Sequence, residues 1–170
     1  MTNRSILVKC VVMLAWFFCC SGRIFADPPA GYPFLPYDEA IQKAKQQNKK
    51  VFLYYGRLGC GYCDMTNKKS FSDPTLKKLY TEHYVLTYVD AESGRRLTLP
   101  TGERVTEMEF GSRLKALVTP VFIFLDADGK PIAKIPGFQK ITDFIQLDAY
   151  VYQGHYKTQS LSDYLAQNPS

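Results

Sequence analysis

The feature that most constrains the fold is a pair of cysteines placed between a strand pattern and a helix pattern. Residues 51–56, "VFLYYG", form a short continuous apolar and aromatic run, which is typical of a buried strand. Cys60 and Cys63 follow shortly after it, and a helix pattern begins between them, at Gly61 or Tyr62. The pair is therefore expected at one edge of a buried sheet, at the start of a helix.

The rest of the chain alternates helix and strand patterns. Helices are predicted over residues 37–50, 61–71, 74–82, 107–118, 141–153 and 160–167, and strands over 84–91, 120–126 and 130–136. The last two strands flank the turn "DADG" and form a hairpin. Such alternation predicts an α/β fold, with helices on both faces of a mixed central sheet. The polar segment 92–104 is predicted to be a loop or a small hairpin.

Residues 1–26 are predicted to be a secretory signal peptide. Two basic residues precede a short apolar run, and the segment ends in "IFAD". The run is shorter than the ~20 apolar residues of a membrane span. We expect cleavage between Ala26 and Asp27, while cleavage after Gly22, an uncleaved anchor and a lipid-anchored cysteine stay open as alternatives. A proline-rich extended lead-in, residues 27–36, then precedes one domain over 37–170.

Export changes the cysteine count and the charge. Cys10, Cys19 and Cys20 leave with the signal peptide, so Cys60 and Cys63 are the only cysteines expected in the mature chain. Three basic residues also leave while all 16 acidic residues remain, so the formal net charge falls from +5 to +2. A nearly neutral surface gives no support for nucleic-acid binding. We expect a periplasmic protein in an oxidising compartment.

Three other uses of Cys-x-x-Cys fit this chain poorly. Covalent haem attachment needs a histidine after the second cysteine, where the chain has Asp64. A zinc site needs four ligands, and only His83 and His155 are available besides the pair, so no metal is expected. A structural disulfide that closes so small a loop constrains the unfolded chain little.

A redox-active pair fits better. At the start of a helix, free backbone N–H groups and the helix dipole stabilise a Cys60 thiolate, which is the attacking species. Cys63 lies one helical turn further on the same face, where it can displace a mixed disulfide. Gly59 and Gly61 leave room for the backbone of another protein, although both are also ordinary turn residues.

The chain also resembles a known family. A strand, Cys-Gly-Tyr-Cys, a helix, and then "VTPVFIF" before a hairpin resemble the thioredoxin fold over residues 37–155. More narrowly, the segments "CGYCDM", "FSDP", "TPVFIFLDADGK" and "IPGF" are similar to periplasmic SoxW-type thioredoxins associated with bacterial sulfur oxidation operons.

The resemblance implies further site residues. It implies that Pro120 is a cis-proline facing the cysteine pair and that Thr119 offers its backbone to a client peptide. It also implies that Gly137 flanks the active-site groove. Tyr62 and Phe138 are expected to form an apolar rim for the client.

The chain departs from cytosolic thioredoxins at three positions. Tyr62 stands where they carry a proline between the cysteines. Tyr54 stands where they carry a buried aspartate that serves proton transfer, so that relay is absent or rebuilt. Gly59 stands where they carry a tryptophan. Asp64 is expected to be solvated at the helix start. His83 and His155 are expected to have structural or surface roles.

These observations predict an exported thiol-disulfide oxidoreductase. Cys60 attacks a client protein disulfide and Cys63 resolves the mixed disulfide. The family implies a reductase, with electrons from a membrane thiol donor and no bound cofactor. A monomer is expected. A disulfide oxidase or isomerase, and a thioredoxin-fold binding module that is not an enzyme, remain as alternatives.

Overall fold

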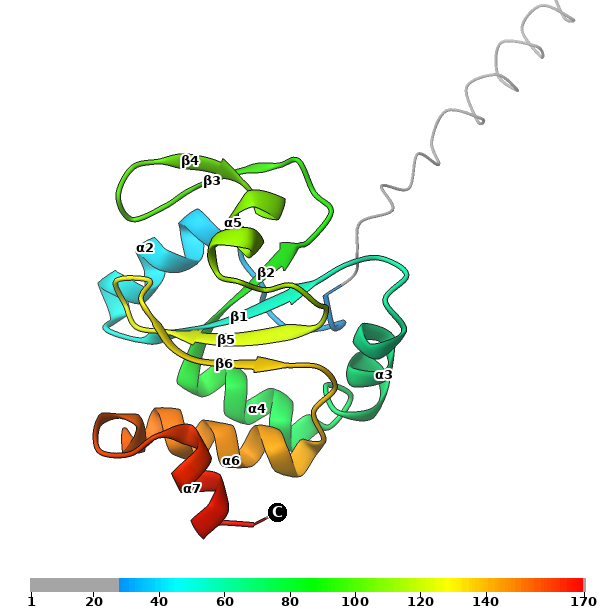
Figure 1. Ribbon diagram of the computed structural model, residues 1–170, viewed down its shortest axis with the longest axis vertical. Helices are drawn as coiled ribbons and strands as arrows, with labels where there is room; N and C mark the ends of the chain where they lie inside the picture. The colour runs from blue at the N-terminus through cyan, green and yellow to red at the C-terminus, as the bar shows by residue number, and fades with distance from the viewer. Residues whose placement is uncertain (1–27, 170) are drawn as a thin grey trace, which may run out of the picture.

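The structure is a computed structural model that describes residues 28–169 (Figure 1). The predicted signal peptide and its cleavage site lie outside these residues. In chain order, the elements are α2 (Tyr37–Gln47), β1 (Lys50–Gly56), α3 (Gly61–Lys69), α4 (Pro74–His83), β2 (Tyr84–Asp90), β3 (Arg96–Thr98), β4 (Arg104–Thr106), α5 (Glu107–Arg113), β5 (Val121–Leu125), β6 (Pro131–Pro136), α6 (Ile141–Tyr152), a 3-10 turn (His155–Lys157) and α7 (Leu161–Gln167).

The central sheet has the strand order β2-β1-β5-β6. Strands β1 and β2 pair in parallel, whereas β5 pairs antiparallel with both β1 and β6. The predicted α/β thioredoxin-like fold with a mixed sheet is therefore confirmed. The polar segment 92–104 was predicted to be a loop or a small hairpin. It contains a small hairpin, in which β3 and β4 form a separate two-stranded antiparallel sheet.

The sheet has helices on both faces (Figure 1). Helices α3, α4 and α6 cover one face, where Phe52 and Tyr54 of β1 belong to a large aromatic cluster. Helices α2 and α5 cover the other face together with the β3–β4 hairpin, and there Val51, Leu53 and Tyr55 are buried. Side chains alternate across a strand, so the continuous apolar run of β1 fills two cores.

The aromatic cluster packs against the cysteine pair, since Cys60 and Cys63 are both members of it. The rings of Phe52 and Tyr80 have centroids 4.8 Å apart at 80°, an edge-to-face contact. The ring centroids of Phe122 in β5 and Phe144 in α6 are 4.9 Å apart. Cys60 and the other members of this cluster are buried together.

The lead-in has little regular structure, but it packs onto the sheet. The Tyr32 ring lies 5.3 Å from that of Phe71. The Leu35 N–H donates to the Leu86 carbonyl oxygen at 2.9 Å, and the Thr87 hydroxyl donates to the Leu35 carbonyl oxygen at 2.9 Å. The segment therefore adds to the core beside β2.

Helix α5 differs from its prediction at its end. Its capping box is present, since Glu109 N–H donates to Thr106 Oγ1 and Thr106 N–H donates to the Glu109 carboxylate. The helix stops at Arg113 rather than continuing to residue 118, and Lys115 has a left-handed φ of 52°. Pro120 disfavours helix in the residue before it. The segment 116–119 is therefore irregular and leads into β5.

Partly buried polar contacts hold the β3–β4 hairpin on the domain. Arg95 Nε donates to Glu107 Oε1 at 3.0 Å, and Glu107 is buried at the start of α5. Thr98 N–H donates to the Asp38 carboxylate at 2.8 Å, which ties β3 to α2. This excursion is therefore a packed part of the domain. No helix within residues 28–169 has the length and apolar character needed to cross a membrane.

Candidate active site

The two cysteines lie at the end of β1, at the start of α3, as the sequence predicts. They form a disulfide with their Cα atoms 5.2 Å apart. Cys60 is the N-cap of α3, and its Sγ accepts the N–H of Cys63 at 3.1 Å. The positive end of the helix dipole therefore faces this sulfur, which favours a thiolate when the disulfide is reduced.

Two segments that are distant in sequence lie beside the cysteine pair. Cys60 Sγ lies 3.4 Å from the carbonyl oxygen of Thr119, and the Thr119–Pro120 peptide bond is cis, as the resemblance implied. The Pro120 carbonyl oxygen accepts the N–H of Gly137 at 2.8 Å. The segment before β5 and the turn after β6 are thus joined beside the cysteines.

The pair is nearly covered by protein, with open space on the glycine side. Cys60 is only 5% exposed. A Cβ placed on Gly59 or Gly61 meets no atom within 4 Å, and the φ of Gly59 is +70°. Tyr62 projects beside them with 61% of its surface exposed, whereas Phe138 is half-buried. The open side of the pair is therefore bordered by the two glycines and Tyr62.

Tyr54 lies beneath α3. Its hydroxyl donates to Asn67 Oδ1 at 3.2 Å and lies 3.5 Å from the Cys63 carbonyl oxygen. Burial, helped by the charge of Asp64, raises the pKa of Tyr54 above its usual range. The hydroxyl therefore stays protonated at neutral pH and serves as a hydrogen-bond donor. It does not replace a carboxylate base.

The remaining polar residues singled out from the sequence do not meet the pair. Asp64 is exposed in the first turn of α3. His83 precedes β2, at the opposite end of the strands; its Nδ1 lies 2.8 Å from Asp148 Oδ1, and its ring stacks on Tyr152. His155 Nε2 lies 3.2 Å from a Gln153 side-chain oxygen. Within residues 28–169, no three His, Cys, Asp or Glu side chains group together as a metal site would need.

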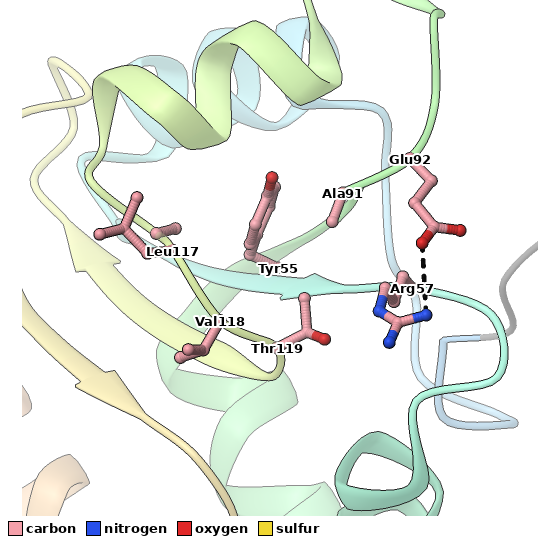
Figure 2. A pocket seen from close by; sticks show the side chains of 8 residues that line it. Tyr55, Arg57, Ala91, Glu92, Leu117, Val118 and Thr119 are labelled. Carbon is pink, nitrogen blue, oxygen red and sulfur yellow. Dashed lines mark hydrogen bonds and ion pairs between the residues drawn. The ribbon is translucent and has the colours of Figure 1, made fainter.

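The sequence did not predict a groove that includes Thr119, the residue whose carbonyl oxygen lies beside Cys60 Sγ (Figure 2). It has a volume of about 440 Å³ and is lined by Tyr55, Arg57, Ala91, Glu92, Ala116, Leu117, Val118 and Thr119. Arg57 Nη1 and Glu92 Oε1 form an ion pair at 3.2 Å across one end. Burial raises the pKa of Tyr55, and the negative charges of Asp90 and Glu107 raise it further.

One sequence signal could have located part of this groove. Gly56 and Asp90 are paired in register at the ends of β1 and β2. In parallel strands the following residues meet at the same edge, so Arg57 and Glu92 become neighbours. No local pattern indicates that segment 116–119 forms the facing wall.

Comparison with known proteins gives one family match over most of the chain. The family described as "Thioredoxin-like domain" matches residues 37–152. Spermatogenesis-associated protein 20 of Mus musculus is 35% identical over 66 residues, which are 39% of this chain and 8% of that protein. Disulfide bond reductase DsbH of Chlamydia pneumoniae is 26% identical over 104 residues, which are 61% of this chain and 61% of that protein. The chain therefore spans less than two thirds of either relative.

Solved structures share the fold. A thioredoxin-fold protein from Helicobacter pylori superposes with a TM-score of 0.60 at 22% identity, over 71% of this chain and 80% of that one. At this identity the similarity shows the architecture alone.

Proposed function

The chain belongs to the thioredoxin-like domain family, and from this premise we propose that it is an exported thiol-disulfide oxidoreductase that reduces disulfides of periplasmic client proteins. One observation carries the proposal. Cys60 Sγ lies at the N-terminus of α3, accepts the Cys63 N–H at 3.1 Å and lies 3.4 Å from the Thr119 carbonyl oxygen. Similarity to a disulfide bond reductase supports the reducing direction.

The reaction needs only the two cysteines and the client. The Cys60 thiolate attacks one sulfur of the client disulfide, forms a Cys60–client mixed disulfide and releases the first client thiolate. The Cys63 thiolate then attacks Cys60 Sγ and releases the second client thiolate. Two electrons pass to the client, its thiolates take up two protons, and the protein is left with the Cys60–Cys63 disulfide.

The surroundings of the pair support a role in client binding. Gly61 and Tyr62 border the open side, while Thr119, Pro120 and Gly137 form the wall next to Cys60. We assign these five residues to contacts with the client backbone and side chains.

A membrane thiol donor that reduces the Cys60–Cys63 disulfide completes the cycle, with no bound cofactor. From the narrower resemblance to SoxW-type thioredoxins, we propose a client that belongs to bacterial sulfur oxidation. A monomer suffices, since both cysteines come from one chain.

A trapping experiment tests the enzyme proposal. In Cys63→Ala, the mixed disulfide cannot be resolved, so clients should accumulate on Cys60 as adducts that thiol reagents release. The Cys60→Ala, Cys63→Ala double variant is the control and should trap nothing. A protein that retains the same partners in the double variant is a binding module, and absence of any thiol-releasable adduct refutes the enzyme proposal.

The reduction potential of the pair decides the direction. A value near ~ −270 mV, like that of thioredoxin, supports a reductase. A value near ~ −120 mV, like that of the strong periplasmic oxidant, makes the protein a disulfide donor.

A further inference from the structure

Helix α3, which carries the cysteine pair, is held to the rest of the site at both of its ends. At its N-terminal end, Cys60 Sγ lies 3.4 Å from the carbonyl oxygen of Thr119. At its C-terminal end, the hydroxyl of the C-cap residue Ser70 donates to the carbonyl oxygen of Gln139 at 2.6 Å. Gln139 belongs to the turn between β6 and α6, so this bond joins α3 to a segment 69 positions away in sequence (Figure 1).

The turn between β6 and α6 is also bonded to the segment that precedes β5. The N–H of Gly137 donates to the carbonyl oxygen of Pro120 at 2.8 Å. The side-chain amide of Gln139 donates to the carbonyl oxygens of Pro136 and Gly137 at 3.2 and 3.3 Å. These two bonds close the turn on itself, so a group that holds Gln139 also holds Gly137.

Together the contacts form a closed ring. It runs from Cys60 through Thr119–Pro120, the turn 137–139 and Ser70, and then back along α3 to Cys60. Helix α3 has nine residues and is therefore about 14 Å long. Ser70 lies too far from the sulfurs to take part in their chemistry, and it can act on them only through this ring.

The core fixes the position of Ser70. Its exposed fraction is 0%, and the neighbouring Phe71 is buried with its ring centroid 4.9 Å from that of Phe144. A buried hydroxyl costs free energy unless it is hydrogen-bonded, and the Gln139 carbonyl oxygen is the acceptor for this one. The hydroxyl therefore projects from a fixed point and holds the turn in place.

We propose that Ser70 is a positioning residue for the thiol chemistry, because its bond to the Gln139 carbonyl oxygen holds the turn after β6, and with it Thr119–Pro120, in place beside Cys60. The inference rests on the proposed function, since it concerns the approach of a client polypeptide to Cys60. A polypeptide that contacts Thr119 needs this segment in its place, whereas a small disulfide needs only access to the sulfur. Loss of the Ser70 hydroxyl should therefore impair the reaction with polypeptides selectively.

Hydrogen exchange of the Gly137 amide measures how firmly the turn is held. In Ser70→Ala, protection of the Gly137 N–H should fall about five-fold, as the loss of one hydrogen bond predicts. Ser72→Ala is the matched control, because the Ser72 hydroxyl also donates to a backbone carbonyl oxygen at 2.6 Å, but to that of Lys68 within α3 itself. This control should leave the Gly137 protection unchanged.

Two chromogenic disulfides measure the effect on the chemistry. The first is a short blocked peptide whose one cysteine is joined by a disulfide to 2-nitro-5-thiobenzoate. In the Cys63→Ala background, the Cys60 thiolate attacks the peptide sulfur, a Cys60–peptide disulfide forms and the coloured thiolate leaves. The second is the symmetrical disulfide of the chromophore, which has no polypeptide backbone.

The ratio of the two rates reports positioning. A small misplacement caused by a change far from the chemistry can cost up to ~10²-fold in rate. Adding Ser70→Ala to the Cys63→Ala background should slow the peptide reaction about five- to ten-fold, because the turn is loosened but not removed. The reaction with the symmetrical disulfide should stay within about two-fold, since it depends on access to Cys60 alone.

Two further variants separate positioning from stability. Tyr80→Phe removes a buried hydroxyl that donates to the Phe144 carbonyl oxygen at 2.8 Å, so it should lose similar stability and keep the rate ratio. Gln139→Ala removes the side-chain bonds that close the turn but keeps the carbonyl oxygen for Ser70, so it should lower the ratio in the same direction. Because Gln139 is only half-buried, this variant decides the outcome if Ser70→Ala does not fold.

The outcomes separate the two proposals. An unchanged rate ratio in Ser70→Ala, an equal fall in Tyr80→Phe, or unchanged Gly137 protection overturns the positioning role and leaves the proposed function standing. If Ser70→Ala does not fold, an unchanged ratio in Gln139→Ala overturns it. A Cys60 that reacts with neither disulfide in the Cys63→Ala parent overturns the proposed function itself.

Discussion

Replacement of Tyr54 by phenylalanine tests whether the hydroxyl beneath the cysteines supports the fold or the chemistry. The change removes the hydrogen bond from Tyr54 Oη to Asn67 Oδ1 and keeps the ring contacts with Phe71 and Phe122, whose centroids lie 5.8 and 5.0 Å away. Tyr54 is buried, so water does not take the place of the lost hydroxyl. Loss of one neutral hydrogen bond should lower the unfolding free energy by about 1 kcal/mol.

The expected thermal shift follows from this value. For a domain of this size, about 1 kcal/mol lowers Tm by roughly 2–4 °C. Tyr80→Phe is the matched control, since the Tyr80 hydroxyl donates to the Phe144 carbonyl oxygen at 2.8 Å in the same core, on a helix that lacks the cysteines. Both variants should lose similar stability by differential scanning calorimetry.

Activity distinguishes the two possible roles of Tyr54. Because burial raises its pKa, the hydroxyl is protonated at neutral pH and cannot accept a proton from Cys63. The rate of disulfide reduction by Tyr54→Phe should therefore stay within about two-fold of the parent, whereas loss of a general base costs about 10²-fold or more. A loss of that size in Tyr54→Phe, with Tyr80→Phe unaffected, would refute the reasoning and make Tyr54 part of the proton relay.

Three further predictions concern stability. Gly111→Ala should lower Tm, because the new Cβ would overlap the Tyr55 hydroxyl and ring. Overpacking should cost about 1–3 kcal/mol of unfolding free energy, more than the ~1 kcal/mol that alanine gains over glycine in a helix; a higher Tm would contradict this prediction. Gly59→Ala should lower the free energy of unfolding by about 1–2 kcal/mol, because the φ of Gly59 is +70°. Gly61→Ala, inside α3 with equally open space, should leave that free energy unchanged or raise it. Equal losses of stability for the two variants in urea titrations would contradict this difference. Alkaline solution should destabilise the protein, because burial raises the pKa of Tyr54, Tyr80 and Tyr84. The unfolded chain loses these protons from pH ~10 while the folded chain keeps them, so the unfolding free energy should fall by about 1.4 kcal/mol per pH unit for each tyrosine between pH ~10 and its folded pKa. Denaturant titrations that give the same stability at pH ~9 and pH ~11 would contradict it.

Local signals predicted most of the elements. The apolar run of β1, the Asp73-Pro74 start of α4 and the Thr106 capping box each depend on residues close in sequence, and each is present in the structure. The predicted end of α5 was wrong. The helix pattern in the sequence continues through residue 118, whereas the chain must leave the helix earlier to enter β5 beside β1. That requirement comes from strand pairing, which no local pattern contains.

By itself, the sequence determined that a cysteine pair follows a buried strand and begins a helix within an α/β domain. This holds because burial periodicity and helix capping act over a few residues. Only the tertiary structure decided what surrounds the pair. Thr119 reaches Cys60 across 59 positions and Arg57 meets Glu92 across 35, through the pairing of β1 with β5 and with β2. Strand partners are chosen by the packing of the whole core, so the groove appears only when that core is assembled.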